Sequence, residues 1–332
     1  MKGNKGRSKG LARLQAAGVL ITLSAVSVLF SGRQGGAEPR QDARAVTSEG
    51  AATRFVVESD LVLVPITVTT GKGQAVPGLT KDLFSVFEDH VPQAITHFTA
   101  EDAPAAIGLV FDASDSMGPK MTMAQEAVYA LLRNANPNDE FFLIRFSDHP
   151  HLIVPLTTDA NEVRRAAEGL VVGGSTAVLD AINMAWIEMR RARTTRKAIV
   201  LISDGEDNAS RLSREEFRRL AAENDPLIFT LFVGETPNFS GWHTLRTTGV
   251  ALLDDIARQA GGRMFPVTNG KQLPQTAAKI GSWIRSQYVV GYVPTIENRH
   301  AGYHRIEVKL SRPPGTPKLH SSWRLGYYAP GE

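Results

Sequence analysis

The sequence predicts an α/β protein in which a doubly wound, mostly parallel sheet is inserted into a β-sandwich-like domain. Three observations predict this fold class. Residues 103–285 alternate short apolar runs with segments of helical spacing, a rhythm typical of a parallel sheet covered by helices on both faces. Residues 54–100 and 286–328 carry only strand patterns. Because each flank is too small to bury a core alone, we expect both to form one β domain together.

The central segment should begin with a strand at 106–111, an entirely apolar run that suits a strand covered on both faces. Further strands are expected at 141–146, 152–154, 198–202, 227–233 and 263–267. Helical spacing predicts helices at 121–132, from a cap at Asp159 or Asn161 to Leu170, and at 177–193, 213–223, 252–259 and 273–284.

The flanks are expected to supply six or seven short strands separated by turns rich in glycine and proline. The first flank should contribute strands at 55–57, 61–68, 84–89 and 95–98, and the second at 288–292, 304–310 and 323–328. Neither flank shows an internal repeat.

The N-terminus has the order of an export signal. Residues 1–37 begin with a cationic stretch, continue with an apolar run of roughly 15 residues and end in small residues at Ala37. We expect a signal peptide cleaved near Ala37, a polar linker at 38–53, and a secreted or periplasmic mature protein with no membrane span. The alternative is a retained N-terminal anchor, although the run is shorter than the ~20 residues of a bilayer span.

Charge and cysteine usage exclude several kinds of protein. The net charge of +3 arises from a +6 segment at residues 1–37, so the remainder is slightly acidic and gives no sign of a nucleic-acid partner. The chain contains no cysteine, which excludes disulfides, thiolate metal sites and a cysteine nucleophile. A hydrophobic content of 42% leaves ample material for a core.

Three polar loops occur where an open α/β sheet binds ligands, next to the carboxyl ends of its strands. Residues 112–116, Asp-Ala-Ser-Asp-Ser, follow the first apolar strand directly. Residues 173–176, Gly-Gly-Ser-Thr, precede a helix, and residues 203–207, Ser-Asp-Gly-Glu-Asp, begin at the end of another strand. One such loop would be a weak signal, but three in this order are a strong one.

These loops resemble the metal-ion-dependent adhesion site (MIDAS) of the von Willebrand factor A (VWA) family, which combines Asp-x-Ser-x-Ser with a distant Thr and a further Asp. The resemblance implies a VWA fold, related to the Rossmann fold, and the metal ligands Asp112, Ser114, Ser116, Thr176 and Asp204. Asp115 stands where many relatives carry Gly and adds a charge without removing a ligand. Residues 78–84, 287–292 and 324–327 are similar to secreted bacterial VWFA-related proteins, so the resemblance covers nearly the whole mature chain.

The ligand set that the resemblance implies has a physical logic. All five side chains offer hard oxygen, which favours Mg²⁺, or Mn²⁺ and Ca²⁺, over soft metals. Only two of the five are carboxylates, so the ion would remain electrophilic and could accept an acidic side chain from a protein partner. The sequence therefore predicts a non-enzymatic, metal-dependent binding module used in adhesion or complex assembly.

Other interpretations of the same residues remain open. Asp112 and Asp204 could cap the following helices, and Glu206 and Asp207 are expected at a solvated loop end. Asp180 is expected either to cap a helix or to support a metal ligand from behind. His149 and His151 are expected at the surface. A metal-assisted hydrolase would need a general base, and the three loops contain no His or Lys. A structural envelope module, in which the metal only stabilises loops, is the third alternative.

Overall fold

The computed structural model describes residues 61–100, 103–234, 249–295, 301–312, 315 and 318–329. All of them belong to one compact unit, residues 57–332. The predicted signal peptide, the linker and the strand at 55–57 lie outside the described residues. Within the described ranges, no helix is both long and apolar enough to cross a membrane.

The central sheet has six strands in the order β10-β9-β8-β5-β6-β7. All neighbours pair in parallel except β7, which is antiparallel to β6. The strands are β5 Ala105–Asp112, β6 Glu140–Phe146, β7 Pro150–Thr157, β8 Arg196–Ser203, β9 Leu227–Val233 and β10 Met264–Val267. The described residues of β5, β8 and β9 are almost entirely buried, as expected of central parallel strands.

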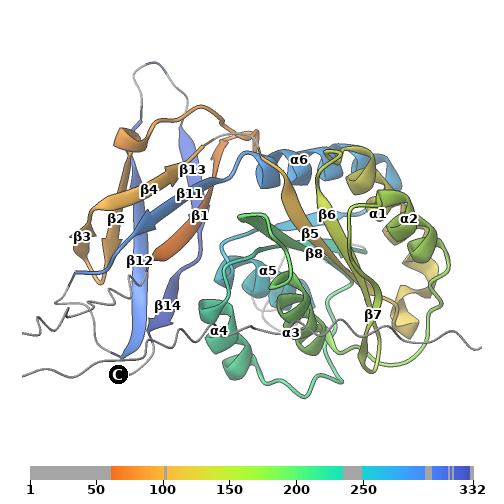
Figure 1. Ribbon diagram of the computed structural model, residues 1–332. Coiled ribbons are helices and arrows are strands. Elements are labelled where there is room, and N and C mark those ends of the chain that lie inside the picture. The colour runs from red at the N-terminus through yellow and green to blue at the C-terminus, as the bar shows by residue number, and fades with distance from the viewer. Residues whose placement is uncertain are drawn as a thin grey trace, which may run out of the picture. The chain divides into compact units, whose positions relative to one another are not determined.

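Helices cover both faces of this sheet (Figure 1). Apolar residues of α1 (Met121–Arg133), α2 (Ala160–Glu168) and α6 (Leu273–Arg285) form one core with alternate residues of β5 such as Leu109. Residues of α3 (Val178–Met189), α4 (Arg214–Glu223) and α5 (Gly249–Gln259) form a second core on the opposite face with Val110. Short 3-10 helices lie at η1 Lys81–Leu83, η2 Asp115–Lys120 and η4 Gly270–Gln272.

Both flanks contribute to two antiparallel sheets of four strands each. One has the order β13-β1-β11-β4 and the other β14-β12-β2-β3. Their shared core unites Val64 of β1 and Tyr292 of β11 with Val86 of β2 and Ile306 of β12, so the two sheets pack face to face. The strands are β1 Val62–Thr70, β2 Phe84–Glu88, β3 Val91–Gln93, β4 Ile95–Thr99, β11 Tyr288–Tyr292, β12 Gly302–Leu310, β13 Leu319–Trp323 and β14 Gly326–Ala329.

The predicted fold class is confirmed: a mostly parallel α/β sheet accompanied by antiparallel sheets built from both flanks. The domain boundaries stay predictions. Two expectations about the β part were wrong. First, the described residues of this part form eight strands, whereas six or seven were expected. Second, the predicted strand at 323–328 is two strands in different sheets, separated at Arg324, whose guanidinium donates to the Leu63 carbonyl over 2.9 Å.

Candidate metal centre

The ends of β5 and β8 bring the first and third predicted loops together. Parallel pairing aligns Phe111 with Ile202, so the next residues, Asp112 and Ser203, lie side by side. The Ser203 hydroxyl donates to Asp112 Oδ2 over 2.6 Å. The two loops are therefore joined by the strand register itself.

Backbone hydrogen bonds attach the second loop to both of the others. The N–H of Gly173 donates to the carbonyl of Ala113 over 2.8 Å. Thr176 donates its N–H to Asn208 Oδ1 over 2.8 Å, and its carbonyl accepts the N–H of Asn208 over 3.0 Å. Thr176 is also buried, with 2% of its surface exposed. The three loops thus form one connected surface at the carboxyl end of the sheet.

Asp112 lies within these connected loops, and its carboxylate is fully buried. Its Oδ1 accepts the N–H of Ser114 over 2.9 Å, and the hydroxyls of Ser114 and Ser116 lie 3.2 Å apart. Burial raises the pKa of Asp112 to about 6, because the ionised form loses its hydration. Hydrogen bonds from Ser114 and Ser203 oppose this rise, and the negative charge of Asp204 adds to it.

The two carboxylate oxygens of Asp204 differ in their hydrogen-bond partners. Its Oδ2 accepts a hydrogen bond from Lys120 Nζ over 2.7 Å, and this carboxylate is almost buried. Its Oδ1 is buried and has no hydrogen-bond partner within the part of the chain that the structure describes. A buried carboxylate oxygen without a partner is costly. A cation beside it would remove that cost.

The structure therefore brings together the predicted ligand residues to different extents. Asp112, Ser114 and Ser116 belong to one hydrogen-bonded group, and the charge of Asp204 acts on Asp112. Thr176 is attached to the neighbouring loops through its backbone. As metal ligands the five residues stay a prediction.

The residues present fit a hard divalent cation. Two carboxylates and three hydroxyls are available in the connected loops, and these are the oxygen ligands that Mg²⁺, Mn²⁺ and Ca²⁺ take. The buried, unpartnered Asp204 Oδ1 and the ammonium group that already lies on Asp204 Oδ2 both indicate that this place favours positive charge.

The capping interpretation of Asp112 and Asp204 is wrong. Helix α1 has Lys120 as its N-cap residue, and α4 has Ser213, whose side chain accepts the N–H of Glu216 over 3.2 Å. Neither aspartate caps the helix that follows its loop. His149, in the turn between β6 and β7, and His151, near the start of β7, are both exposed, as expected of surface histidines.

The contacts of three residues of this region were not predicted from the sequence. Ser203 could have been found from the strand register, since it is the neighbour of Asp112. Lys120 lies in η2, outside the loop pattern, and only the fold brings it to Asp204. Asp207 was expected in solvent but is half-buried, and its Oδ1 accepts the N–H of Val178 over 3.1 Å at the start of α3. Burial raises the pKa of Asp207.

Sequence comparison finds known proteins that are similar to part of this chain. Inter-alpha-trypsin inhibitor heavy chain H4 of Bos taurus is 28% identical over 189 residues, which cover 50% of this chain and 19% of that protein. The magnesium-chelatase 67 kDa subunit of Chlorobaculum parvum is 25% identical over 280 residues, 76% of this chain and 43% of that protein. The chain therefore spans less than half the length of either relative.

One solved structure with a similar arrangement is the von Willebrand factor type A protein from Catenulispora acidiphila. It has a TM-score of 0.47 and 13% identity, and the match covers 82% of this chain and 74% of that one. The family model described as the von Willebrand factor type A domain matches residues 107–206, the segment that contains all five predicted ligands. Residues 107–206 of this chain are therefore similar to the von Willebrand factor type A domain.

Proposed function

We propose that this protein is an extracytoplasmic binding module that holds one divalent cation and grips a protein partner through it. The observation that carries the proposal is the pair of adjacent buried carboxylates, Asp112 and Asp204, one of which has an oxygen without a hydrogen-bond partner in the described residues. Two such charges close together repel each other, and a cation of charge +2 would stabilise both.

The roles of the residues follow from their chemistry. Asp112 and Asp204 would supply the charge that attracts the cation, and Ser114, Ser116 and Thr176 would supply neutral oxygens. Mg²⁺ is the cation that suits this set first, with Mn²⁺ or Ca²⁺ as the alternatives. When bound, the cation supplies an electrophilic position for an acidic side chain of the partner. The connected loops hold the protein ligands in place before the partner arrives, so little order has to be created on binding.

An enzymatic role has less support. A metal-assisted hydrolase needs a general base beside the metal. The three loops contain no His or Lys, but the fold brings the basic side chain of Lys120 to Asp204. Its ammonium group forms an ion pair with Asp204. One similar protein is named a magnesium-chelatase subunit, but the match covers only 43% of that protein. We therefore propose a non-enzymatic function.

The proposed location outside the cytoplasm depends on residues 1–37. The order of charge, apolar run and small residues predicts cleavage near Ala37, so the mature protein should begin near Glu38. Intact-mass measurement of the protein recovered from the producing cells checks this expectation. A mass that includes Met1 and the whole apolar run would contradict cleavage and favour an anchor.

Affinity capture tests the binding function. The immobilised protein is incubated with an envelope extract in Mg²⁺, in chelator, and as the Asp112→Ala variant. We expect one set of partners to be captured in Mg²⁺ and to be lost equally in chelator and with Asp112→Ala. Asp115→Ala is the matched control, because Asp115 is an exposed acid in the same loop and is not a predicted ligand. Capture that survives both chelator and Asp112→Ala would contradict the proposal and favour a structural role.

A further inference from the structure

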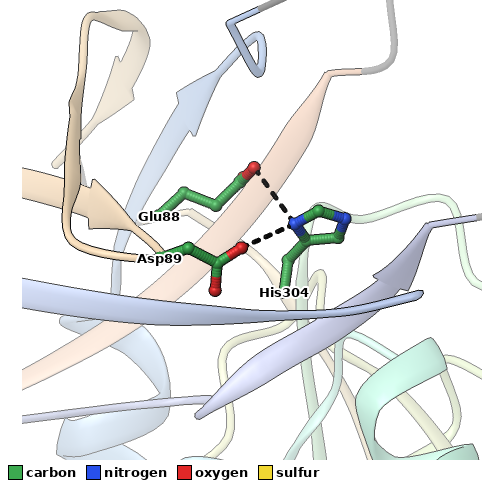
Figure 2. Close-up of side chains that lie close together, drawn as sticks. All are labelled: Glu88, Asp89 and His304. Carbon is green, nitrogen blue, oxygen red and sulfur yellow. Dashed lines mark hydrogen bonds and ion pairs between the residues drawn. The ribbon is translucent and has the colours of Figure 1, made fainter. Parts of the chain in front are cut away.

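A second group of metal-binding side chains lies in the β part, away from the three loops. Glu88 ends β2, Asp89 follows it in the turn to β3, and His304 lies in β12, which pairs with β2. Figure 2 shows both carboxylates directed at the Nδ1 atom of His304. The ring nitrogen lies 2.8 Å from Asp89 Oδ2 and 3.6 Å from Glu88 Oε1. Glu88 and His304 are fully buried, whereas the Asp89 side chain is 34% exposed.

The far oxygen of each carboxylate is held by donors of the protein. Glu88 Oε2 accepts the hydroxyls of Tyr292, over 2.6 Å, and Tyr327, over 3.0 Å. Asp89 Oδ1 accepts the N–H of Arg305 over 2.9 Å. These bonds orient the other oxygen of each carboxylate toward His304, as partners behind metal ligands do.

The backbone of the turn that carries Asp89 is held in a conformation that is energetically unfavourable for residues other than glycine. Asp89 and His90 both have positive φ, 47° and 71°, although neither is glycine. The N–H of Asp89 also donates to the carbonyl of Arg305 over 3.0 Å, which fixes the turn against β12. Backbone and side chain of Asp89 are therefore both positioned by the same neighbouring strand.

The spacing of the three ligand atoms suits a small transition-metal ion. Bonds of about 2.0–2.1 Å in a tetrahedron place the ligand atoms about 3.3 Å apart. The two distances from His304 Nδ1, 2.8 and 3.6 Å, lie on either side of that value, and all three ligand atoms lie within 4.8 Å of one another. Each of these two distances would have to change by less than about 1 Å to reach it, and the partly exposed side of Asp89 leaves access for a water ligand.

We propose that Glu88, Asp89 and His304 form a site for a divalent transition-metal ion of the Zn²⁺ type. A +2 ion matches the charge of the two carboxylates, and an imidazole nitrogen with carboxylate oxygens favours Zn²⁺ over Mg²⁺. The site is chemically different from the oxygen-only centre of the α/β domain. It ties the β2–β3 turn to β12, a cross-link that disulfides cannot supply because the chain has no cysteine.

Zinc titration of the full chain tests the proposal, in an Asp112→Ala background so that the α/β centre does not contribute. With excess Mg²⁺ present, we expect one Zn²⁺ per chain by calorimetry and a rise in melting temperature on addition of Zn²⁺. Co²⁺ in place of Zn²⁺ should give the visible absorption of a low-symmetry site. Adding His304→Gln should abolish all three signals, and Asp89→Asn, a milder change at the exposed edge, should weaken Zn²⁺ affinity at least about tenfold.

His320→Gln is the matched control, because His320 is an exposed histidine of β13 in the same β part. It should bind Zn²⁺ like its parent. The proposal is overturned if the Asp112→Ala protein binds no Zn²⁺, or if Asp89→Asn and His304→Gln bind it as well as their parent. The cluster would then be an ion pair between a protonated His304 and two carboxylates. If His304→Gln fails to fold, Asp89→Asn and the Co²⁺ spectrum of the parent decide the question.

Discussion

The ammonium group of Lys120 occupies one oxygen of a predicted metal ligand, Asp204. An ammonium and a divalent cation that share a carboxylate repel each other, so Lys120 competes with the cation for Asp204. Lys120 is the last residue of η2, which begins within the first loop, so the fold places this competitor beside the centre. Lys120 should therefore set the cation affinity of the domain below what the oxygen ligands alone would give.

Replacing Lys120 with Met should raise the affinity for Mg²⁺. An ion pair near the surface contributes on the order of 1 kcal/mol, which corresponds to roughly a fivefold change in the dissociation constant. Calorimetric titration of Mg²⁺ into wild type and Lys120→Met measures the two dissociation constants. Lys279→Met, at an exposed site of α6, removes the same charge elsewhere and should leave affinity nearly unchanged. Equal affinities for wild type and Lys120→Met would show that the ion pair does not compete with the metal.

At the scale of elements, periodicity and caps predicted most of the α/β part from the sequence. The apolar run of β5 and the helix α4, with Ser213 at its start, are two clear cases. The hairpin of β2 and β3 was missed because its turn, Asp89–His90, contains no glycine despite its positive φ values. The strand at 323–328 was read as one element because nothing in its pattern shows that Arg324 leaves one sheet before the next begins.

The capping box of α4 gives a pH-dependent prediction. The Ser213 hydroxyl and N–H both bond to Glu216, and these bonds lower the pKa of that carboxyl. A carboxyl with a lowered pKa stabilises the fold above its unfolded-state pKa, and this contribution is lost as the pH falls through the folded-state pKa. Ser213→Ala should lower the free energy of unfolding by about 1 kcal/mol at pH 7.

The loss caused by Ser213→Ala should become smaller at a pH below the folded-state pKa of Glu216, where the carboxyl is protonated in both proteins. Denaturant unfolding at neutral and acidic pH measures the two differences. Ser213→Thr keeps the capping oxygen and should remain close to wild type at both. A loss that is the same or larger at acidic pH would contradict the role assigned to Glu216.

At the scale of the whole molecule, buried side chains connect the β part to the α/β part. Arg324 Nη1 forms an ion pair with Asp225 over 2.8 Å, and its Nη2 donates to the carbonyl of Leu63. The Trp283 indole N–H of α6 donates to the carbonyl of Gly73 over 3.0 Å. These contacts join segments that lie far apart in the sequence, so composition and periodicity could not predict them.

Arg324→Ala should lower the free energy of unfolding by about 1–3 kcal/mol, because it leaves the Leu63 carbonyl without this donor and removes a nearly buried side chain. Thermal and denaturant unfolding measure the change. The control is Arg218→Ala, which breaks the exposed ion pair with Asp255 (3.1 Å) and should cost well under 1 kcal/mol. Similar losses in the two variants would show that Arg324 does not connect the two parts.

The sequence also indicated that both flanks belong together, because neither could bury its own apolar face, and both antiparallel sheets combine them. It could not indicate the cluster around His304, which lies 215 residues from Asp89 along the chain. The five ligands, which stay predictions, could be proposed from the sequence because their loops resemble a family motif and each loop follows a recognisable strand or precedes a recognisable helix. Ser203 and Lys120 were missed because their roles depend on register and on tertiary packing.

The most direct test of the central claim is calorimetric titration of Mg²⁺ into wild type, Asp112→Ala and Asp115→Ala. Wild type and Asp115→Ala should each bind about one Mg²⁺ per chain with similar affinity. Asp112→Ala should bind at least about 100-fold more weakly, since changing residues that only orient a metal ligand already costs about 10–100-fold. Thr176→Ala should lose less Mg²⁺ affinity than Asp112→Ala, because it removes a neutral oxygen and not a charged carboxylate. Equal Mg²⁺ affinity in wild type and Asp112→Ala would contradict the claim that these loops hold a cation.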